Sequence, residues 1–268
     1  MRQICKYFFI TILFFLLVGC GTENSIDLGP KKEVVSYSKK AYAVKGFSSL
    51  VFESDFSNVE VYCQDYDEIK FEITKKIRGI GEKSELEKKL NDFSVETSDT
   101  DNKVSFKSSY KGNIKGVADK TVDVKIFVPK VMDSVSLKLN TGTIKILDNV
   151  KCALKTELKM VNVDISSFEG KLKFIADMGN IRINGGRIYK DSYIKIGEGN
   201  VNIKAEFYNE GSSHFETGMG NIELLLPSDS KLNFENIGDV EINEFKEAPG
   251  AGKLQLNTSM GKIAIRKY

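Results

Sequence analysis

A short alternation of apolar and polar residues recurs seven times between about Val135 and Ile265. In each copy the second and fourth residues after an anchor are aliphatic, and the first and third are polar or small. Successive anchors lie 19, 18, 20, 21, 18 and 23 residues apart. The second anchor is Val161, and the other six are glycines that we expect in turns: Gly142, Gly179, Gly199, Gly220, Gly238 and Gly261. A period of two with one fixed apolar face predicts a half-buried strand in every copy.

A second apolar position recurs five residues before the anchor in Leu137, Phe174, Ile194, Phe215 and Leu256. Each repeat therefore offers two strand segments joined by a turn, and no repeat shows the 3.6-residue spacing of a helix. A period near 20 residues is typical of stacked repeats whose equivalent strands pair in parallel. The predicted fold class is all-β: a parallel β-solenoid, or β-helix, of about seven coils over residues 132–268.

The preceding segment, residues 41–131, is strand-rich but less regular. Residues 47–52, 59–61, 69–73, 104–106 and 122–128 alternate as strands do, and Ser57 stands where a repeat would have its glycine. Ser84 and Glu87 have the spacing of a capping box, which predicts one short helix over roughly 84–92. We expect residues 41–268 to form one continuous domain.

The first 19 residues have the features of a secretory signal. Arg2 and Lys6 precede a 12-residue apolar run, Tyr7 to Val18, which is too short to span a membrane. Leu17, Val18 and Gly19 precede Cys20 and resemble a bacterial lipobox, which implies cleavage before Cys20 and a lipid on its thiol. Residues 20–40 are polar and are predicted to be a flexible tether. The alternatives are an ordinary secretory signal or a short uncleaved anchor.

Charge and composition exclude one class of function. The chain has a net charge of +2, but without residues 1–19 it has 37 basic and 37 acidic residues. A neutral chain without a basic run gives no electrostatic basis for binding nucleic acid. Apart from Cys5 and Cys20, the cysteines are Cys63 and Cys152, which either form a disulfide or remain as two buried thiols.

The sequence contains no recognisable catalytic or cofactor-binding motif. His214 is the single histidine, so a histidine-based metal site is excluded, and we expect no cofactor. Glu223, Asp239 and Glu241 are the acidic candidates, with Glu223 and Glu241 expected about 5 Å apart on neighbouring coils. Three interpretations remain open for them: a solvated ladder, a weak cation site, or the carboxylate pair of a polysaccharide-active β-helix enzyme.

Copies of the repeat such as Leu139–Gly142 and Leu256–Gly261, after a strand ending at Val128–Pro129–Lys130, resemble a known family. It is the bacterial adhesin-like family with the β-helical toastrack domain (DUF4097), and the resemblance spans roughly residues 45–267. This sequence departs from the family pattern at Val161, where the turn glycine is missing. The resemblance implies an envelope protein, often attached to a membrane, and some members are implicated in envelope-stress signalling.

These observations predict a lipid-anchored protein on the extracytoplasmic face of the cell membrane. We expect a non-enzymatic, adhesin-like or scaffold surface for an envelope protein or a glycan, with a stress-signalling module or a polysaccharide-active enzyme as alternatives. The last repeat ends near Tyr268, so we also expect an uncovered strand edge there that could pair with a second copy.

Overall fold

The computed structural model describes residues 30–46, 48–208, 210–246 and 252–268. Residues Lys31–Tyr268 form one compact unit. Its N-terminal elements are β1 (Lys32–Ala43), β2 (Ser49–Gln64), β3 (Glu68–Gly79), α2 (Lys83–Leu90), β4 (Phe93–Thr100), β5 (Lys103–Tyr110) and β6 (Val117–Pro129). The elements that follow are β7 (Val131–Gly170), β8 (Leu172–Met178), β9 (Ile181–Ile183), β10 (Gly186–Ile188), β11 (Tyr193–Glu198), β12 (Val201–Lys204), β13 (Glu206–Phe207), β14 (Ser212–Met219), β15 (Ile222–Leu226), β16 (Leu232–Asn243) and β17 (Gly252–Lys267).

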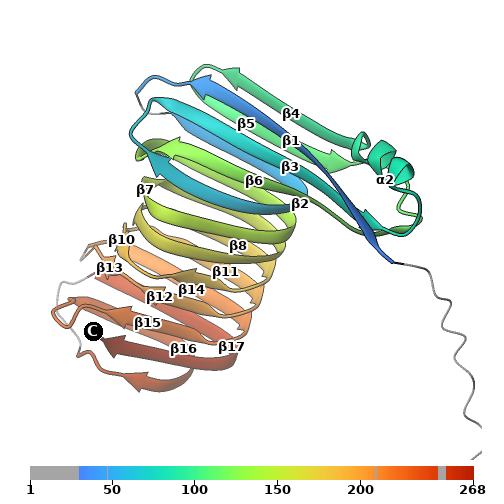
Figure 1. Ribbon diagram of the computed structural model, residues 1–268. Helices are drawn as coiled ribbons and strands as arrows, with labels where there is room; N and C mark the ends of the chain where they lie inside the picture. The colour runs from blue at the N-terminus through green and yellow to red at the C-terminus, as the bar shows by residue number, and fades with distance from the viewer. Residues whose placement is uncertain (1–29, 47, 209, 247–251) are drawn as a thin grey trace, which may run out of the picture. The chain divides into compact units, whose positions relative to one another are not determined.

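The described strands belong to one 17-stranded sheet (Figure 1). The strand pairing joins eight of them into a closed ring of parallel pairs. From β7 the pairing passes through β8, β11 and β14 to β17, and returns through β15, β12 and β9 to β7. The long strands β7 and β17 close the ring, because each pairs with two of its strands along consecutive segments. β7 pairs with β8 and then β9, and β17 pairs with β14 and then β15. The other strands lie outside this barrel.

The predicted fold class, a β-solenoid of about seven coils, is therefore wrong, although the chain is all-β with one helix among its described residues. The prediction assumed that every repeat stacks on the one before it in chain order. Instead β17 pairs directly with β14 and β15, and β16 pairs with the other side of β17. Strand periodicity fixes which residues face the core, but it does not fix the order in which strands pair.

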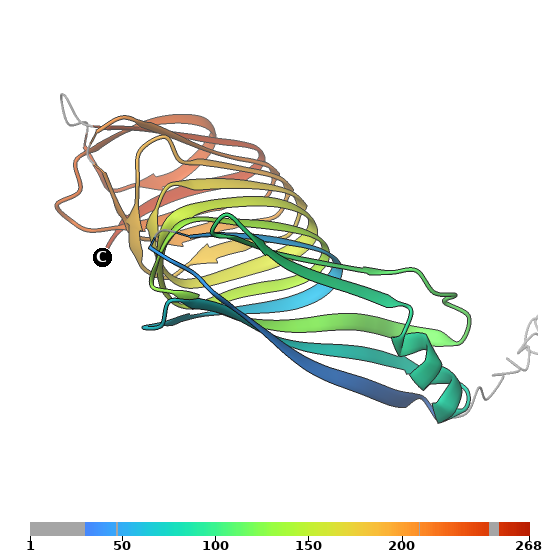
Figure 2. The ribbon, with the colours of Figure 1, turned by 90° about the horizontal axis from the view of Figure 1, so that it is seen from above.

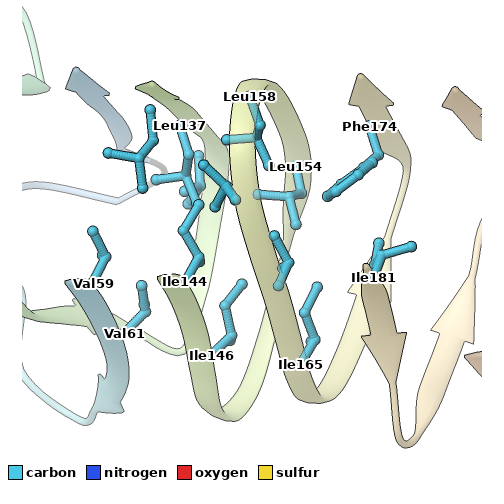
Figure 3. Close-up of a cluster of buried hydrophobic side chains, with 14 of the residues drawn as sticks. Val59, Val61, Leu137, Ile144, Ile146, Leu154, Leu158, Ile165, Phe174 and Ile181 are labelled. Carbon is cyan, nitrogen blue, oxygen red and sulfur yellow. The ribbon is translucent and has the colours of Figure 1, made fainter. Parts of the chain in front are cut away.

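The parallel pairing of equivalent repeat positions is confirmed. Val163 pairs with Ile181, Ile181 with Val201, Val201 with Ile222, and Ile222 with Ile263. Figure 3 shows aliphatic and aromatic side chains of successive strands directed toward one another in the interior, and the labelled residues are buried. Burying each such side chain contributes roughly 1.5–3 kcal/mol, so this core is the main stabilising feature of the fold.

The N-terminal strands add antiparallel pairs to the parallel barrel. β2 pairs in parallel with β7, and Ser57 lies opposite Gly142, which confirms that Ser57 occupies the position of a repeat glycine. On its other side, β2 pairs in parallel with β5 and β6. β6 then pairs antiparallel with β3, and β3 with β1, while β5 pairs antiparallel with β4. Phe106 stacks on Phe52 at 4.6 Å between ring centroids and lies 5.4 Å from Phe71, which joins these strands into one core.

Two local predictions in this part differ from the structure. Residues 32–40 belong to β1 and are not tether, because β1 pairs along its whole length with β3. The predicted helix exists as α2, at the far ends of the antiparallel strands (Figure 2), and buries Leu86 and Leu90. Its N-cap is Glu82, without a side-chain capping bond, so the capping box predicted at Ser84 is wrong. Within the described residues, no helix has the length and apolarity that crossing a membrane requires.

Candidate binding surface beside the turn glycines

At the turn glycines, the neighbouring backbone leaves no room for a side chain. All six predicted turn glycines have φ between 129 and 151°, a range that residues with a side chain rarely adopt. A Cβ atom on Gly199 would lie 1.8 Å from the carbonyl oxygen of Gly179, and one on Gly179 would lie 2.0 Å from that of Val161. From Val161, which has no glycine, to Gly220 each turn therefore lies directly against the preceding one, and the turn at Gly261 lies against that at Gly220. The residues that follow these turns are aligned.

The residues that follow four of the turns form a ladder of asparagine side chains. Asn162 Oδ1 accepts hydrogen bonds from the backbone N–H and from Nδ2 of Asn180, both at 2.9 Å. Asn180 Oδ1 accepts in the same way from Asn200, and Asn200 Oδ1 accepts from the backbone N–H of Asn221. Asn221 Oδ1 then accepts from the backbone N–H of Lys262. We call Asn162, Asn180, Asn200 and Asn221 the amide ladder.

The amide ladder retains hydrogen-bonding capacity on its exposed side. An amide NH₂ group has two N–H donors, and in Asn180 and Asn200 the ladder uses one of them. The second donor of each group is available to a ligand. Because neighbouring strands lie about 4.8 Å apart, these donors recur at that interval along the surface.

A groove of about 490 Å³ runs beside this ladder. Its lining includes Lys145, Asp164, Arg182 and Asn202 together with Asn162, Asn180 and Asn200. Asp164 accepts a hydrogen bond of 2.8 Å from Nδ2 of Asn184. Lys145 and Arg182 are exposed, and neither forms an ion pair with any residue in the described ranges. The groove thus combines a row of amide donors with two cations that form no ion pair among the described residues, and with one carboxylate, Asp164, which lies opposite Arg182 in the strand register.

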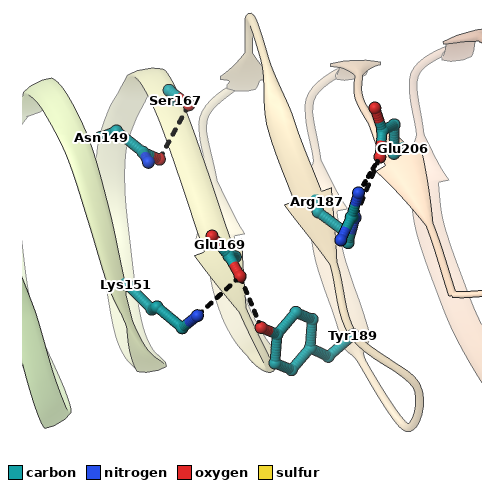
Figure 4. A network of polar contacts seen from close by, with 7 residues as sticks. All are labelled: Asn149, Lys151, Ser167, Glu169, Arg187, Tyr189 and Glu206. Atoms are coloured by element: carbon teal, nitrogen blue, oxygen red, sulfur yellow. Dashed lines mark hydrogen bonds and ion pairs between the residues drawn. The ribbon is translucent and has the colours of Figure 1, made fainter.

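Another polar surface is internally paired (Figure 4). It consists of Asn149, Lys151, Ser167, Glu169, Arg187, Tyr189 and Glu206. Glu169 accepts from Lys151 Nζ at 2.9 Å and from the Tyr189 hydroxyl at 2.7 Å, and these bonds hold the pKa of its carboxyl below the usual value. Arg187 donates from Nε and Nη2 to one oxygen of Glu206. Because its charged groups already have partners, this surface is a weaker candidate for binding a charged ligand than the groove.

The three acidic candidates do not form a common site. Glu223 lies opposite Ala264 of β17, and β17 separates it from Glu241 on β16, so the expected 5 Å stack is wrong. Glu223 lies 3.8 Å from Arg266 Nε, and Glu241 lies 3.5 Å from Lys262 Nζ. Asp239 lies opposite Lys262. In the part of the chain that the structure describes, no group of three or more His, Cys, Asp or Glu residues could hold a metal ion.

The other candidate residues have structural environments. His214 stacks on Tyr193 at 5.6 Å between ring centroids and lies 3.3 Å from both Gln255 Oε1 and Glu216 Oε2. Cys63 and Cys152 are free thiols, so no disulfide joins them. Burial raises the pKa of Cys63 to about 11 and that of Cys152 to about 12, which makes both poor nucleophiles at neutral pH. The lipobox residues Leu17, Val18, Gly19 and Cys20 lie outside the described residues.

Sequence reasoning placed the asparagines on the exposed face of the strands but did not find their ladder. The signal was present, because an asparagine follows the anchor at four successive repeats, 161, 179, 199 and 220. In the sequence Lys145, Asp164 and Arg182 stand at the third position after successive anchors, where every repeat has a polar or small residue. The lack of ion-pair partners of Lys145 and Arg182 among the described residues depends on side-chain conformations, which the sequence pattern does not specify.

Comparison with known proteins gives distant structural likenesses. No family model and no curated protein matches the sequence. A "putative cell adhesion protein" from Clostridium sporogenes aligns with 88% of this chain and 100% of its own, at 13% identity and a TM-score of 0.36. A "putative adhesin" from Bacteroides fragilis aligns with 86% of this chain and 97% of its own, at 13% identity and a TM-score of 0.39.

A third neighbour has a different name. A "putative lipid binding protein" from Parabacteroides distasonis aligns with 85% of this chain and 96% of its own, at 9% identity and a TM-score of 0.21. At these identities and TM-scores the likenesses carry no conclusion about function, and membership of the adhesin-like family stays a prediction.

Proposed function

We propose that this protein is a lipid-anchored, non-enzymatic envelope protein whose groove beside the amide ladder binds an extended acidic glycan. The observation that carries the proposal is the coincidence, in one groove, of regularly spaced amide donors with the two exposed cations Lys145 and Arg182. A polymer with hydroxyl groups and carboxylates at regular intervals has the matching acceptors.

The division of roles follows from the side-chain chemistry. Hydroxyl and ring oxygens of a sugar accept hydrogen bonds from the free N–H groups of Asn180 and Asn200. The planar guanidinium of Arg182 can bind a carboxylate with two parallel hydrogen bonds, and Lys145 adds a second charge. Binding depends on many modest contacts along the ligand, so affinity should increase with its length.

The positions of the acidic candidates in the described residues support a binding role. The acidic residues that an enzyme of this kind would need, Glu223, Asp239 and Glu241, are divided between two strands separated by β17. They also lie beside basic residues, as expected for a solvated surface. A polysaccharide-active enzyme therefore has less support than a binding surface.

The proposal is tested by calorimetric titration of the full chain, in detergent micelles, with oligomers of an acidic polysaccharide (polygalacturonate) and of a neutral one (dextran). We expect binding of the acidic oligomers only, weakened by salt because exposed charges are screened. Lys145→Ala combined with Arg182→Ala should weaken it about tenfold or more, because a hydrogen bond to a charged group contributes roughly 1.5–3 kcal/mol.

Lys40→Ala is the matched control, because Lys40 is an exposed lysine on β1, remote in the sheet from the groove. It should leave the affinity unchanged. Equal binding of the neutral and acidic oligomers, or wild-type affinity in the double variant, would contradict the proposal.

A further inference from the structure

Four of the six methionines lie in one exposed row. They are Met160, Met178, Met219 and Met260, with exposed fractions of 56%, 44%, 44% and 59%. Each immediately precedes the anchor of a repeat, so each reaches the surface at the same point of its turn. Met132, in contrast, is buried in the core. The row is separate from the amide ladder, which begins one residue after each anchor.

The strand register places these methionines in two adjacent pairs. Met160 lies directly opposite Met178, and Met219 lies directly opposite Met260. Partners in neighbouring strands lie about 4.8 Å apart. A methionine side chain is unbranched and has three rotatable bonds, so two thioether sulfurs at this spacing can converge on one atom above the sheet.

A carboxylate lies between the two pairs. Glu198 is opposite Met178 on one side and Met219 on the other. Glu198 is exposed, and its carboxylate has no hydrogen-bond or ion-pair partner in the described ranges. The row therefore has four soft sulfur atoms and one uncompensated negative charge. An apolar partner would have to desolvate that charge, whereas a cation would benefit from it.

We propose that this row binds soft monovalent metal ions of the Cu(I) and Ag(I) class, one at Met160 and Met178 and one at Met219 and Met260. Thioether sulfur selects Cu(I) over the harder divalent ions, which prefer oxygen and nitrogen. Glu198 increases the affinity of both sites through its charge and is not required as a direct ligand.

The test uses the full chain with ¹³C-labelled methionine methyl groups, titrated with silver nitrate in a chloride-free buffer. Each methionine gives its own methyl resonance, so binding by the cysteine thiols does not obscure the result. We expect the resonances of Met160, Met178, Met219 and Met260 to shift and that of the buried Met132 to stay in place. The divalent ion Mg²⁺ should shift none of them.

Variants separate the two sites and the role of the charge. Met160→Leu with Met178→Leu should abolish only the first site and leave the shifts of Met219 and Met260 unchanged, and the converse pair should do the opposite. Replacement of Met by Leu preserves volume, so the fold should survive. Glu198→Gln should weaken both sites roughly threefold to fivefold at low salt, as expected for a charge about 5 Å away in water.

The proposal is overturned if the four resonances do not move at excess Ag(I), or if they move no more than that of Met132. It is also overturned if the methionines do not respond in the pairs that the strand register sets, that is, if Met160 shifts together with Met260 and not with Met178.

Discussion

At the scale of single residues, the turn glycines decide how closely the strands approach. The missing side chain lets the carbonyl oxygen of one turn lie where a Cβ of the next would be, as between Gly179 and Gly199. The same close approach aligns Asn180 with Asn200, so that each Oδ1 can accept from the following backbone N–H. The geometry of the proposed glycan site therefore depends on glycines that do not contact the ligand.

We expect Gly199→Ala to reduce the free energy of unfolding by at least about 2 kcal/mol. The added Cβ would lie 1.8 Å from the Gly179 carbonyl oxygen, and its φ of 146° is strained for alanine. Urea denaturation followed by circular dichroism measures the change. Gly185→Ala is the control, because the nearest atom to its Cβ would be 3.5 Å away, and it should cost less than about 0.5 kcal/mol. Equal costs for the two variants would contradict the close-packing argument.

At the scale of elements, the repeats predicted which positions pair but not which strand pairs with which. Val201 and Ile222 are aligned because both stand two residues after a glycine. The position of β16 could not be predicted in this way, because its repeat at Gly238 has the same apolar pattern as the others. In the structure β16 pairs only with β17 among the described strands, with register shifts after Ile237 and Val240. The uncovered edge belongs to β16 and not, as predicted, to the end of the last repeat.

This uncovered edge should allow a second copy of the chain to pair with β16. Ile237 is 68% exposed and Val240 is 40% exposed, so the edge strand offers both free backbone groups and apolar side chains. We expect concentration-dependent self-association in analytical ultracentrifugation that Ile237→Lys abolishes without loss of stability. Val35→Lys, at an exposed position of β1, serves as the control. A chain that stays monomeric at high concentration, or an Ile237→Lys variant that still associates, would exclude this mode of assembly.

At the scale of the whole molecule, attachment and binding are proposed for different parts of the chain. The lipobox resemblance predicts an attachment point at Cys20, and the described part, with its paired sheet and buried core, is proposed as a rigid binding surface. A rigid surface loses little conformational entropy on binding, which favours recognition of an extended ligand through many weak contacts.

We expect the full chain, expressed in a bacterial host, to incorporate a labelled fatty acid and to sediment with the membrane fraction. Cys20→Ser should lose the label and reduce membrane association, because the acyl chains contribute roughly 0.8 kcal/mol for each buried methylene group. Cys63→Ser keeps the lipobox and should behave as the wild type. Unchanged labelling of Cys20→Ser would exclude lipid attachment at this residue.

The central claim, that an acidic glycan lies along the amide ladder, is tested most directly by hydrogen–deuterium exchange of the full chain with and without polygalacturonate oligomers. We expect slower exchange at the backbone amides of Asn180, Asn200 and Asn221, which donate to the ladder, and no change around Arg187 and Glu206. Protection confined to the surface around Arg187, or no protection at saturating ligand, would contradict it.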